Sequence, residues 1–208
     1  QGVDINDNTT LNSASSTHSV DITAEDNTTI TDLTGTLAAS SSNSVGIALG
    51  ANVFWKDVIA RANGNIKADE NVRVMADTRQ NLTSMVVGIA ASTGGTTGAG
   101  SVGVGLIKST TFAEIGSSAD IYTAGSVQLH AGDDTDIFMM EPAASFSAGG
   151  NSLAGAVGAA VFVGQTKAKI KDGATVIALG NSAVQAETET TQTSSPLLDG
   201  IMGGDDNQ

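Results

Sequence analysis

Apolar residues recur at every second position over much of the chain, which is the period of a β-strand. The spacing is clearest at Val102, Val104 and Leu106. Glycine, asparagine, aspartate and serine separate such segments and favour turns, because positive φ angles cost them little. The small-residue run at 153–163 could form a helix in isolation, but its counterpart at 101–107 alternates valine and glycine. The pattern predicts an all-β protein.

The strand pattern repeats about every 55 residues. Ile66, Ile121 and Val176 each precede an alanine by ten positions. The segments that we align upstream of them are 44–49, 101–106 and 156–161, preceded by 38–40, 90–92 and 143–145. These alignments predict a partial repeat at 1–37, repeats at 38–92, 93–142 and 143–193, and a C-terminal tail or cap at 194–208.

The repeat length and the strand period together favour a parallel β-helix, or β-solenoid, in which each layer closes the one below. A β-helix coil of the usual kind takes about 20 residues. A unit of about 55 residues therefore predicts two coils plus a glycine-rich strand-turn-strand excursion. The excursion is expected at 86–107, with counterparts at 37–49 and 143–163, either projecting as a hairpin or wrapping as an extra strand.

Large side chains are scarce, which favours a narrow interior over a thick globular core. The 208 residues include 25 glycines but only five phenylalanines, one tyrosine and one tryptophan. Three uncharged stretches, at 33–55, 84–107 and 143–166, are long enough to cross a membrane. Clusters of serine, glycine, threonine and asparagine interrupt each stretch, so we do not expect membrane insertion.

The net charge of −13 argues against binding to nucleic acid or to an anionic membrane, since both require positive charge. The absence of cysteine excludes disulfides, thiolate metal sites and a cysteine nucleophile. The first residues show no basic and apolar leader, so we expect a mature or internal segment.

Three motifs recur in a fixed order along the repeats. They are Ser/Ala-Val-Gly-small-small-apolar, then Thr-x-Ala-x-Ile, then Val-x-Ala-x-Gly-x-x-x-Val-x-Ala, as at 156–161, 166–170 and 176–186. Over about residues 20–190 the chain resembles filamentous-haemagglutinin-like adhesins and the related leukotoxin-type filamentous proteins of anaerobic Gram-negative bacteria. The resemblance implies a right-handed parallel β-helix stalk at the cell surface, exported through an outer-membrane partner. The secretion domain of such proteins is not recognisable in this sequence.

Acidic residues follow the terminal alanine of each unit. The candidates for a metal site are Asp26, Asp77, Asp133, Asp134, Asp136 and Glu187. If the units stack, these carboxylates are expected to form a ladder along one turn edge, where oxygen ligands could bind Ca²⁺. The alternative is a solvated acidic edge that prevents aggregation. No other cofactor is expected.

A second charged pattern comes from Lys167, Lys169 and Lys171, which alternate along one predicted strand. Alternation places the three lysines on one face and Ala168 and Ile170 on the other. We interpret the lysine face as a polar outer surface, with a patch for acidic glycans as the alternative.

Other candidate residues carry weaker signals. Asn8, Asn27 and Asn81 match the glycosylation pattern. His18 and His130 lack a neighbouring nucleophile or metal-ligand spacing, so we predict no enzymatic activity.

The sequence therefore favours a structural stalk segment of a secreted, cell-surface filamentous adhesin. Its partners would be neighbouring repeats or subunits, together with a host-surface or matrix ligand. The first alternative is a self-assembling extracellular filament or sheath subunit. The second is a β-helix carbohydrate-active enzyme that uses paired carboxylates among Asp133, Asp134 and Asp136.

Overall fold

The computed structural model describes residues 18–194, and every regular element in this range is a β-strand. The prediction of an all-β protein is confirmed for this part of the chain. Asn8 and nearly all of the predicted C-terminal tail lie outside the described residues.

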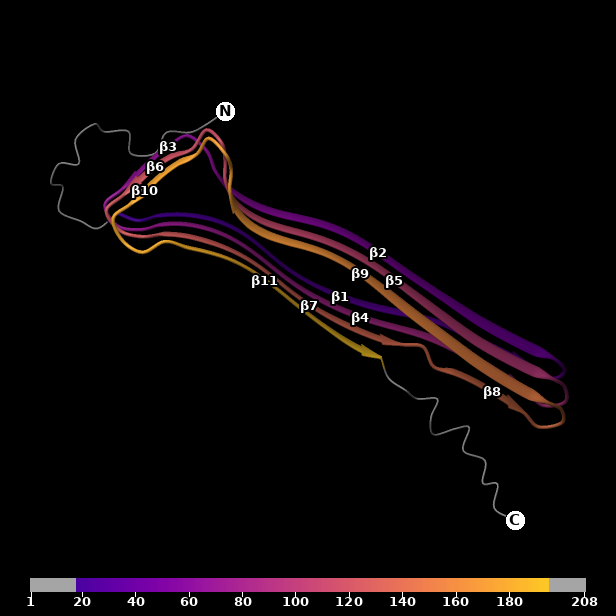
Figure 1. The fold of residues 1–208 in the computed structure, drawn as a ribbon. Helices are drawn as coiled ribbons and strands as arrows, with labels where there is room; N and C mark the ends of the chain where they lie inside the picture. Colours follow the sequence, from indigo (N-terminus) through magenta and orange to yellow (C-terminus); the bar gives the residue numbers. More distant parts are fainter. Residues whose placement is uncertain (1–17, 195–208) are drawn as a thin grey trace, which may run out of the picture.

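The chain passes three times through the same series of strands (Figure 1). The first pass contains β1 (Val20–Ser40), β2 (Ser44–Ala62) and β3 (Asn65–Ala68). The second contains β4 (Val72–Ser92), β5 (Thr97–Ile115) and β6 (Asp120–Thr123). The third contains β7 (Val127–Met140), β8 (Ala143–Ser147), β9 (Ser152–Ile170) and β10 (Thr175–Ala178), after which β11 (Ala183–Ser194) begins a fourth pass.

Equivalent strands of successive passes pair in parallel and form three sheets. The two long sheets have the orders β1-β4-β7-β11, with β8 also pairing with β4, and β2-β5-β9. The short sheet has the order β10-β6-β3. Figure 1 shows the long sheets running together along the molecule, with the short sheet at one end. Turns 41–43, 93–96 and 148–151 lie at the other end, and we call this half of the molecule the turn half.

Each repeat forms one long pass, which corrects the prediction of two coils plus an excursion. The strands on either side of a glycine-rich turn belong to different sheets: β4 pairs with β1, β7 and β8, whereas β5 pairs with β2 and β9. They are therefore not the two strands of a hairpin. The physical reason is strand length, since strands of 19 to 21 residues use most of a repeat in a single circuit.

The predicted repeat alignment is confirmed in the short sheet and next to it. Ile66, Ile121 and Val176 are register partners across β3, β6 and β10. Ala76 and Ala131 pair across β4 and β7 in the same way. The large apolar side chains of Ile66, Ile121 and Val176 identify the register.

The alignment is only partly right in the turn half, where Val102 pairs with Val157 and Ala38 with Ala90 as predicted. Val45 pairs with Gly98 instead of Val102, and Ala90 pairs with Ser145 instead of Ala143. These shifts are four and two residues, and even shifts keep every side chain on its original face. The alternation of apolar and polar residues therefore could not reveal them.

The main core lies near the short sheet and is built from aliphatic residues. The largest of its fully buried side chains are Ile66, Val72, Val74, Ile115, Ile121 and Leu129. A smaller cluster of Leu82, Ile107, Ile137 and Met139 lies further along the long sheets. Both clusters are narrow, in agreement with the scarcity of aromatic residues.

Small residues bring the two long sheets close together in the turn half. A Cβ atom at Gly46 would lie 2.5 Å from the carbonyl oxygen of Ile89, and one at Gly88 would lie 2.1 Å from that of Gly100. Backbone therefore packs against backbone at these two contacts, although larger inward side chains such as Val86 fit elsewhere in this half. The described residues contain no helix long and apolar enough to cross a membrane.

Candidate functional site

The structure divides the predicted calcium-binding residues between two faces of the β1-β4-β7-β11 sheet. Asp77, Asp134, Asp136 and Glu187 face outward. Asp26 and Asp133 face the interior, where Asp133 is only 2% exposed. The six residues therefore do not line one turn edge as expected. The strands do not end at the preceding alanines but continue through the acidic positions.

Of the predicted residues, Asp77, Asp134 and Glu187 line a hollow of about 490 Å³, which Asp26 and Asp133 also border and Asp136 does not. Gly132 is one of its lining residues, and an added Cβ there would lie 2.7 Å from Asp77 Oδ1. His130 Nε2 lies 3.3 Å from the same carboxylate oxygen. Other lining residues include Glu25, Arg79 and Glu189.

This hollow is acidic but does not gather a compact ligand set. Within residues 18–194, no three histidine, aspartate or glutamate side chains are close enough together to hold a metal ion. The outward carboxylates are distributed over neighbouring strands and rows, with Arg79 among them. Calcium binding at Asp77, Asp134, Asp136 and Glu187 stays a prediction.

Polar side chains also cross the interior between the two long sheets, and we call them the inner polar band. Its members are Asp26, Thr28, Lys56, Thr78, Gln80, Ser109, Thr111, Asp133, Thr135, Thr166 and Thr188. Asp26, Thr78, Asp133 and Thr188 are register partners on one wall. Lys56 and Ser109 are partners on the facing wall. The band therefore passes through every layer of the stack.

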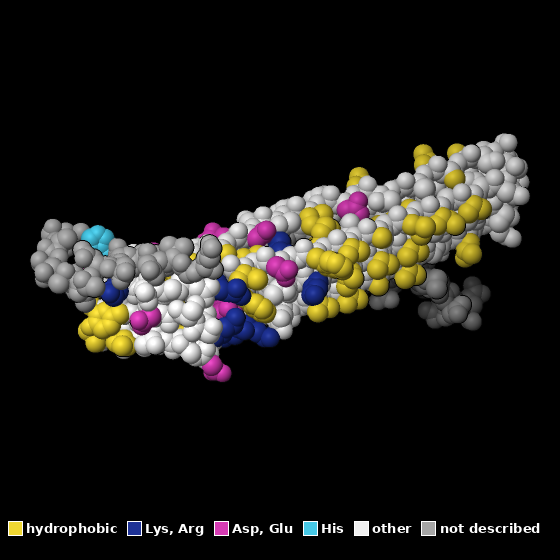
Figure 2. Space-filling view, turned by 90° about the horizontal axis from the view of Figure 1, so that it is seen from above, with side chains coloured by type: hydrophobic (Ala, Val, Ile, Leu, Met, Phe, Trp, Pro, Cys, Tyr) yellow, Lys and Arg dark blue, Asp and Glu magenta, His cyan; other side chains and the backbone are white. Residues whose placement is uncertain are grey.

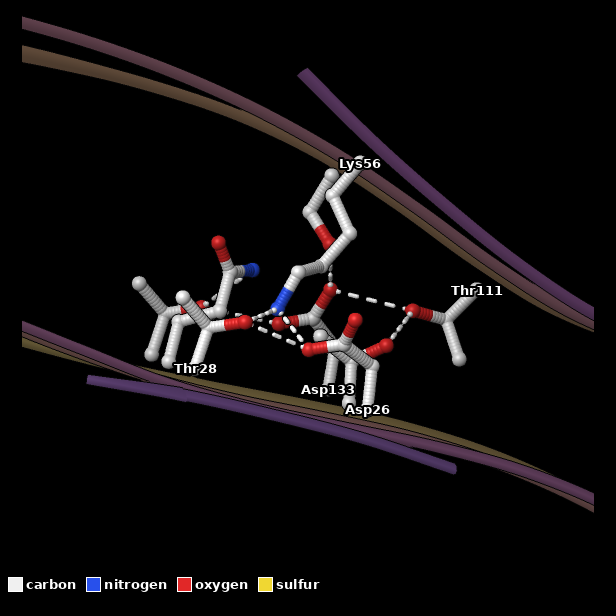
Figure 3. Close-up of polar contacts among 9 residues, drawn as sticks. Asp26, Thr28, Lys56, Thr111 and Asp133 are labelled. Atoms are coloured by element: carbon white, nitrogen blue, oxygen red, sulfur yellow. Dashed lines mark hydrogen bonds and ion pairs between the residues drawn. The ribbon is translucent and has the colours of Figure 1, made fainter. Parts of the chain in front are cut away.

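In the first pass, the band contains an ion pair between Lys56 and Asp26 (Figure 3). Lys56 Nζ also donates a hydrogen bond of 2.7 Å to Thr28 Oγ1. The hydrogen bonds from Lys56 and Thr28 hold the pKa of Asp26 below its usual value. The carboxylate is therefore stabilised in its charged form.

Among the described residues, no cation pairs with Asp133, which is held by hydroxyl groups. Ser109 and Thr111 donate hydrogen bonds of 2.5 and 3.2 Å to Asp133 Oδ2, and Thr135 donates one of 2.8 Å to Oδ1. The hydroxyl groups of Thr111 and Thr78 also share a hydrogen bond, with 2.8 Å between their Oγ1 atoms. All these side chains are buried (Figure 3 labels Asp133 and Thr111).

The inner polar band can specify register where apolar alternation cannot. A two-residue slip would leave inward residues inward but would separate Lys56 from Asp26 and Asp133 from its donors. Unpaired buried polar groups are costly. This role was not predicted from the sequence, although Asp133 lies two residues after the inward Ala131 and therefore on the same face.

A second charge cluster lies on the outer face of the β2-β5-β9 sheet. Arg61, Glu114 and Lys169 are register partners on its three strands. Glu114 is 2% exposed, and its oxygens lie 2.7 Å from Arg61 Nε, 3.3 Å from Lys169 Nζ and 2.6 Å from Lys171 Nζ. Burial raises the pKa of Glu114, but these cations outweigh that effect and lower it overall.

Lys167 and Lys169 both lie over the Phe112 ring, at 5.6 and 6.0 Å from its centroid. This position places them on the outer surface as the alternation predicts. Ala168 packs against the core, whereas Ile170 is 44% exposed in the end pass although its register partner Ile115 is fully buried. Glu114 neutralises part of this lysine group, so a glycan patch receives no further support.

The turn half carries few charges, and Glu141 is one of its acidic residues, together with Asp32 on β1. Glu141 follows β7, and its carboxylate occupies the space above Gly103 and Gly158. Its Oε1 atom is buried without a hydrogen-bond partner, and burial raises the pKa of Glu141. A Cβ at either glycine would lie within 2.5 Å of a carboxylate oxygen, so the Glu141 side chain would have to move to admit it.

The remaining candidates lie apart from these clusters. Asn27 and Asn81 are exposed in the middle of β1 and β4, and their glycosylation stays a prediction. His18 Nδ1 lies 3.7 Å from Asp69 Oδ2.

These features define an all-β protein of stacked parallel strands with polar groups inside. No family model matches the chain, and neither the curated proteins nor the solved structures contain a match.

Proposed function

We propose that this chain is a β-solenoid segment, wound right-handed, of the stalk of a secreted cell-surface filamentous adhesin. The main support is the stacking of three passes in parallel register. Among the described strands, β1, β2 and β3 pair on one side only, and so do β9, β10 and β11 at the other end of the stack. Unpaired parallel edges let further passes extend the same sheets. Right-handed winding is the rule for parallel crossovers.

The geometry also defines how such a stalk would gain length. Each pass advances the stack by one strand spacing, about 4.8 Å, whereas each long strand extends about 65 Å across it. A pass uses about 55 residues, so reach along the stack axis requires many passes. A stalk of useful length would therefore contain many stacked passes. Each pass contributes mainly to its width and stiffness.

A structural role agrees better with the acidic residues than carbohydrate cleavage does. Asp133 faces the interior, away from the outward Asp134 and Asp136. The residues that line the acidic hollow include no phenylalanine, tyrosine or tryptophan. Binding to a host-surface or matrix ligand would then belong to outer surfaces or to other passes of the assembly.

The alternative function is a filament or sheath subunit whose copies stack end to end. The observation in its favour is that both ends of the described stack present the same three sheets, with equivalent strands in the same order. One copy could thus continue the sheets of the next without any change of fold.

An antibody against this chain can separate the two functions in surface extracts of the source organism. For a stalk, it is expected to detect a polypeptide many times longer than 208 residues. A native polypeptide of about this length that forms ordered fibres under the electron microscope would contradict the stalk. That result would support the self-assembling subunit.

A further inference from the structure

The outer face of the β2-β5-β9 sheet is apolar throughout the turn half. We call this surface the apolar outer strip. Its large residues are Val45, Ile47, Leu49, Val53 and Trp55 on β2, Val102, Val104 and Leu106 on β5, and Leu153, Val157, Val161 and Val163 on β9. Figure 2 shows hydrophobic side chains along this half, with lysine and arginine gathered beside them.

The exposure of this strip is not caused by the open ends of the stack. The middle strand β5 has a paired neighbour on each side, yet Val104 is 46% exposed. Register places Val104 between Ala51 and Ala159, and Leu106 between Val53 and Val161. The side chains therefore form continuous apolar rows across three strands.

The strip contains no charge until its last row, where Lys108 lies between Trp55 and Val163. The turns at the other end of the strip are also uncharged. A surface of this kind differs from the opposite sheet, whose outer face holds the acidic hollow. Parallel sheets are normally covered on both faces, so this face lacks its expected cover.

We propose that the apolar outer strip packs face to face against the same strip of a second copy of this chain. Residues 45–55 and their register partners cover three strands. At about 4.8 Å per strand and about 3.3 Å per residue, they give a footprint of about 500 Å² per copy. Two footprints reach about 1,000 Å², the lower limit for a specific interface. More passes would enlarge the contact in proportion.

A two-fold arrangement with the strands running in opposite directions fits the charge distribution. The uncharged turns of one copy would then lie near Lys108 of the other, and the rows with Arg61 and Glu114 would extend beyond the contact. Lys108 would lie at the rim of the contact, where its long side chain can keep the ammonium group in water. Two such sheets pack about 10 Å apart, with interdigitating aliphatic side chains.

A lipid surface fits the same strip less well. Entry into a bilayer would bury the unpaired backbone groups at the strand edges of the described stack, and such groups are costly in hydrocarbon. The net charge of −13 also opposes contact with anionic lipids. A second copy leaves those edges in water.

Sedimentation equilibrium of the purified chain tests the pairing directly. The wild type is expected to dimerise with rising concentration. Val104→Lys, at the centre of the strip, should weaken the dimer at least tenfold, because it buries an unpaired charge. The matched control is Thr110→Lys on the same outward face of β5 but outside the strip. It should dimerise like the wild type.

Cysteine variants keep the test informative if Val104→Lys impairs folding. The chain has no cysteine, so Val104→Cys is expected to give a covalent dimer with a bifunctional maleimide that spans the about 10 Å between the facing sheets. Asn81→Cys, exposed on the opposite sheet, should stay unlinked. A wild type that is monomeric at all concentrations would overturn the proposal. So would equal dimerisation of Val104→Lys, or flotation of the wild type with phosphatidylcholine vesicles in place of dimerisation. End-to-end fibres would leave these comparisons unaffected, because they use the strand edges.

Discussion

Gly88→Ala is expected to lower the free energy of unfolding by about 2–3 kcal/mol, the cost of overpacking a closed interior. The new Cβ would lie 2.1 Å from the carbonyl oxygen of Gly100 and 2.8 Å from its carbonyl carbon. Both are backbone atoms of the facing sheet, so no side-chain rotation can relieve the contact. The two sheets would have to separate, and the adjoining contact of Gly46 with Ile89 would loosen as well.

Gly98→Ala is the matched control for this substitution. Gly98 lies on β5 in the same half of the molecule, but an added Cβ there meets no atom within 4 Å. Alanine in a strand loses less backbone entropy on folding than glycine, which stabilises by roughly 0.5–1 kcal/mol. Urea unfolding followed by circular dichroism measures both variants. Equal midpoints for Gly88→Ala and Gly98→Ala would contradict the close approach of the two sheets.

Asp133→Ala is expected to cost about 2–3 kcal/mol, the penalty for leaving buried hydroxyl groups without an acceptor. The three donors, Ser109, Thr111 and Thr135, are each at most 1% exposed and cannot turn to solvent. Thr111 retains its bond to Thr78, so the loss falls mainly on the other two. Relief of a buried carboxylate offsets part of the cost.

Asp136→Ala provides the comparison, since Asp136 lies three residues further along β7 and faces outward. A surface substitution of this kind usually changes stability by no more than about 0.5 kcal/mol. The same urea titration applies. If the two aspartate variants lose stability equally, the separation of inner and outer acidic residues is wrong.

The sequence was sufficient to predict strands, their repetition and part of their register. Period-two alternation indicates strands directly, and Ile66, Ile121 and Val176 are large enough to mark equivalent positions. The scarcity of large side chains correctly indicated a narrow interior. These properties depend on local residue type, which a single sequence contains.

The number of passes per repeat could not be predicted in the same way. Thr78 and Asp133 look like the polar end of a strand, because buried strands are normally apolar. In the structure both lie inside, and the strands continue past them. Because the inner polar band interrupts the apolar pattern, β4 and β7 look shorter in the sequence than their 21 and 14 residues.

The valines that first defined the pattern proved to lie on the outside. Val102 and Val104 face solvent, while Ser101, Gly103 and Gly105 face the interior. Alternation reports two faces but not which one is buried. Sheet separation decides this here, since glycine at the inward positions 46 and 88 allows the two backbones to approach closely.

The central claim is that successive passes lie one strand spacing apart, in the register that pairs Asn81 with Asp136. A double variant, Asn81→Cys with Asp136→Cys, tests it in a chain that otherwise lacks cysteine. Adjacent register partners lie about 4.8 Å apart, within the Cα separation of roughly 4.4–6.8 Å that a disulfide spans. Mild oxidation of the monomer is therefore expected to link them, as mass spectrometry would detect. Asn81→Cys with Asp134→Cys, two residues out of register on the same face, should not link. Absence of the first disulfide, or equal formation of both, would contradict the stacked register.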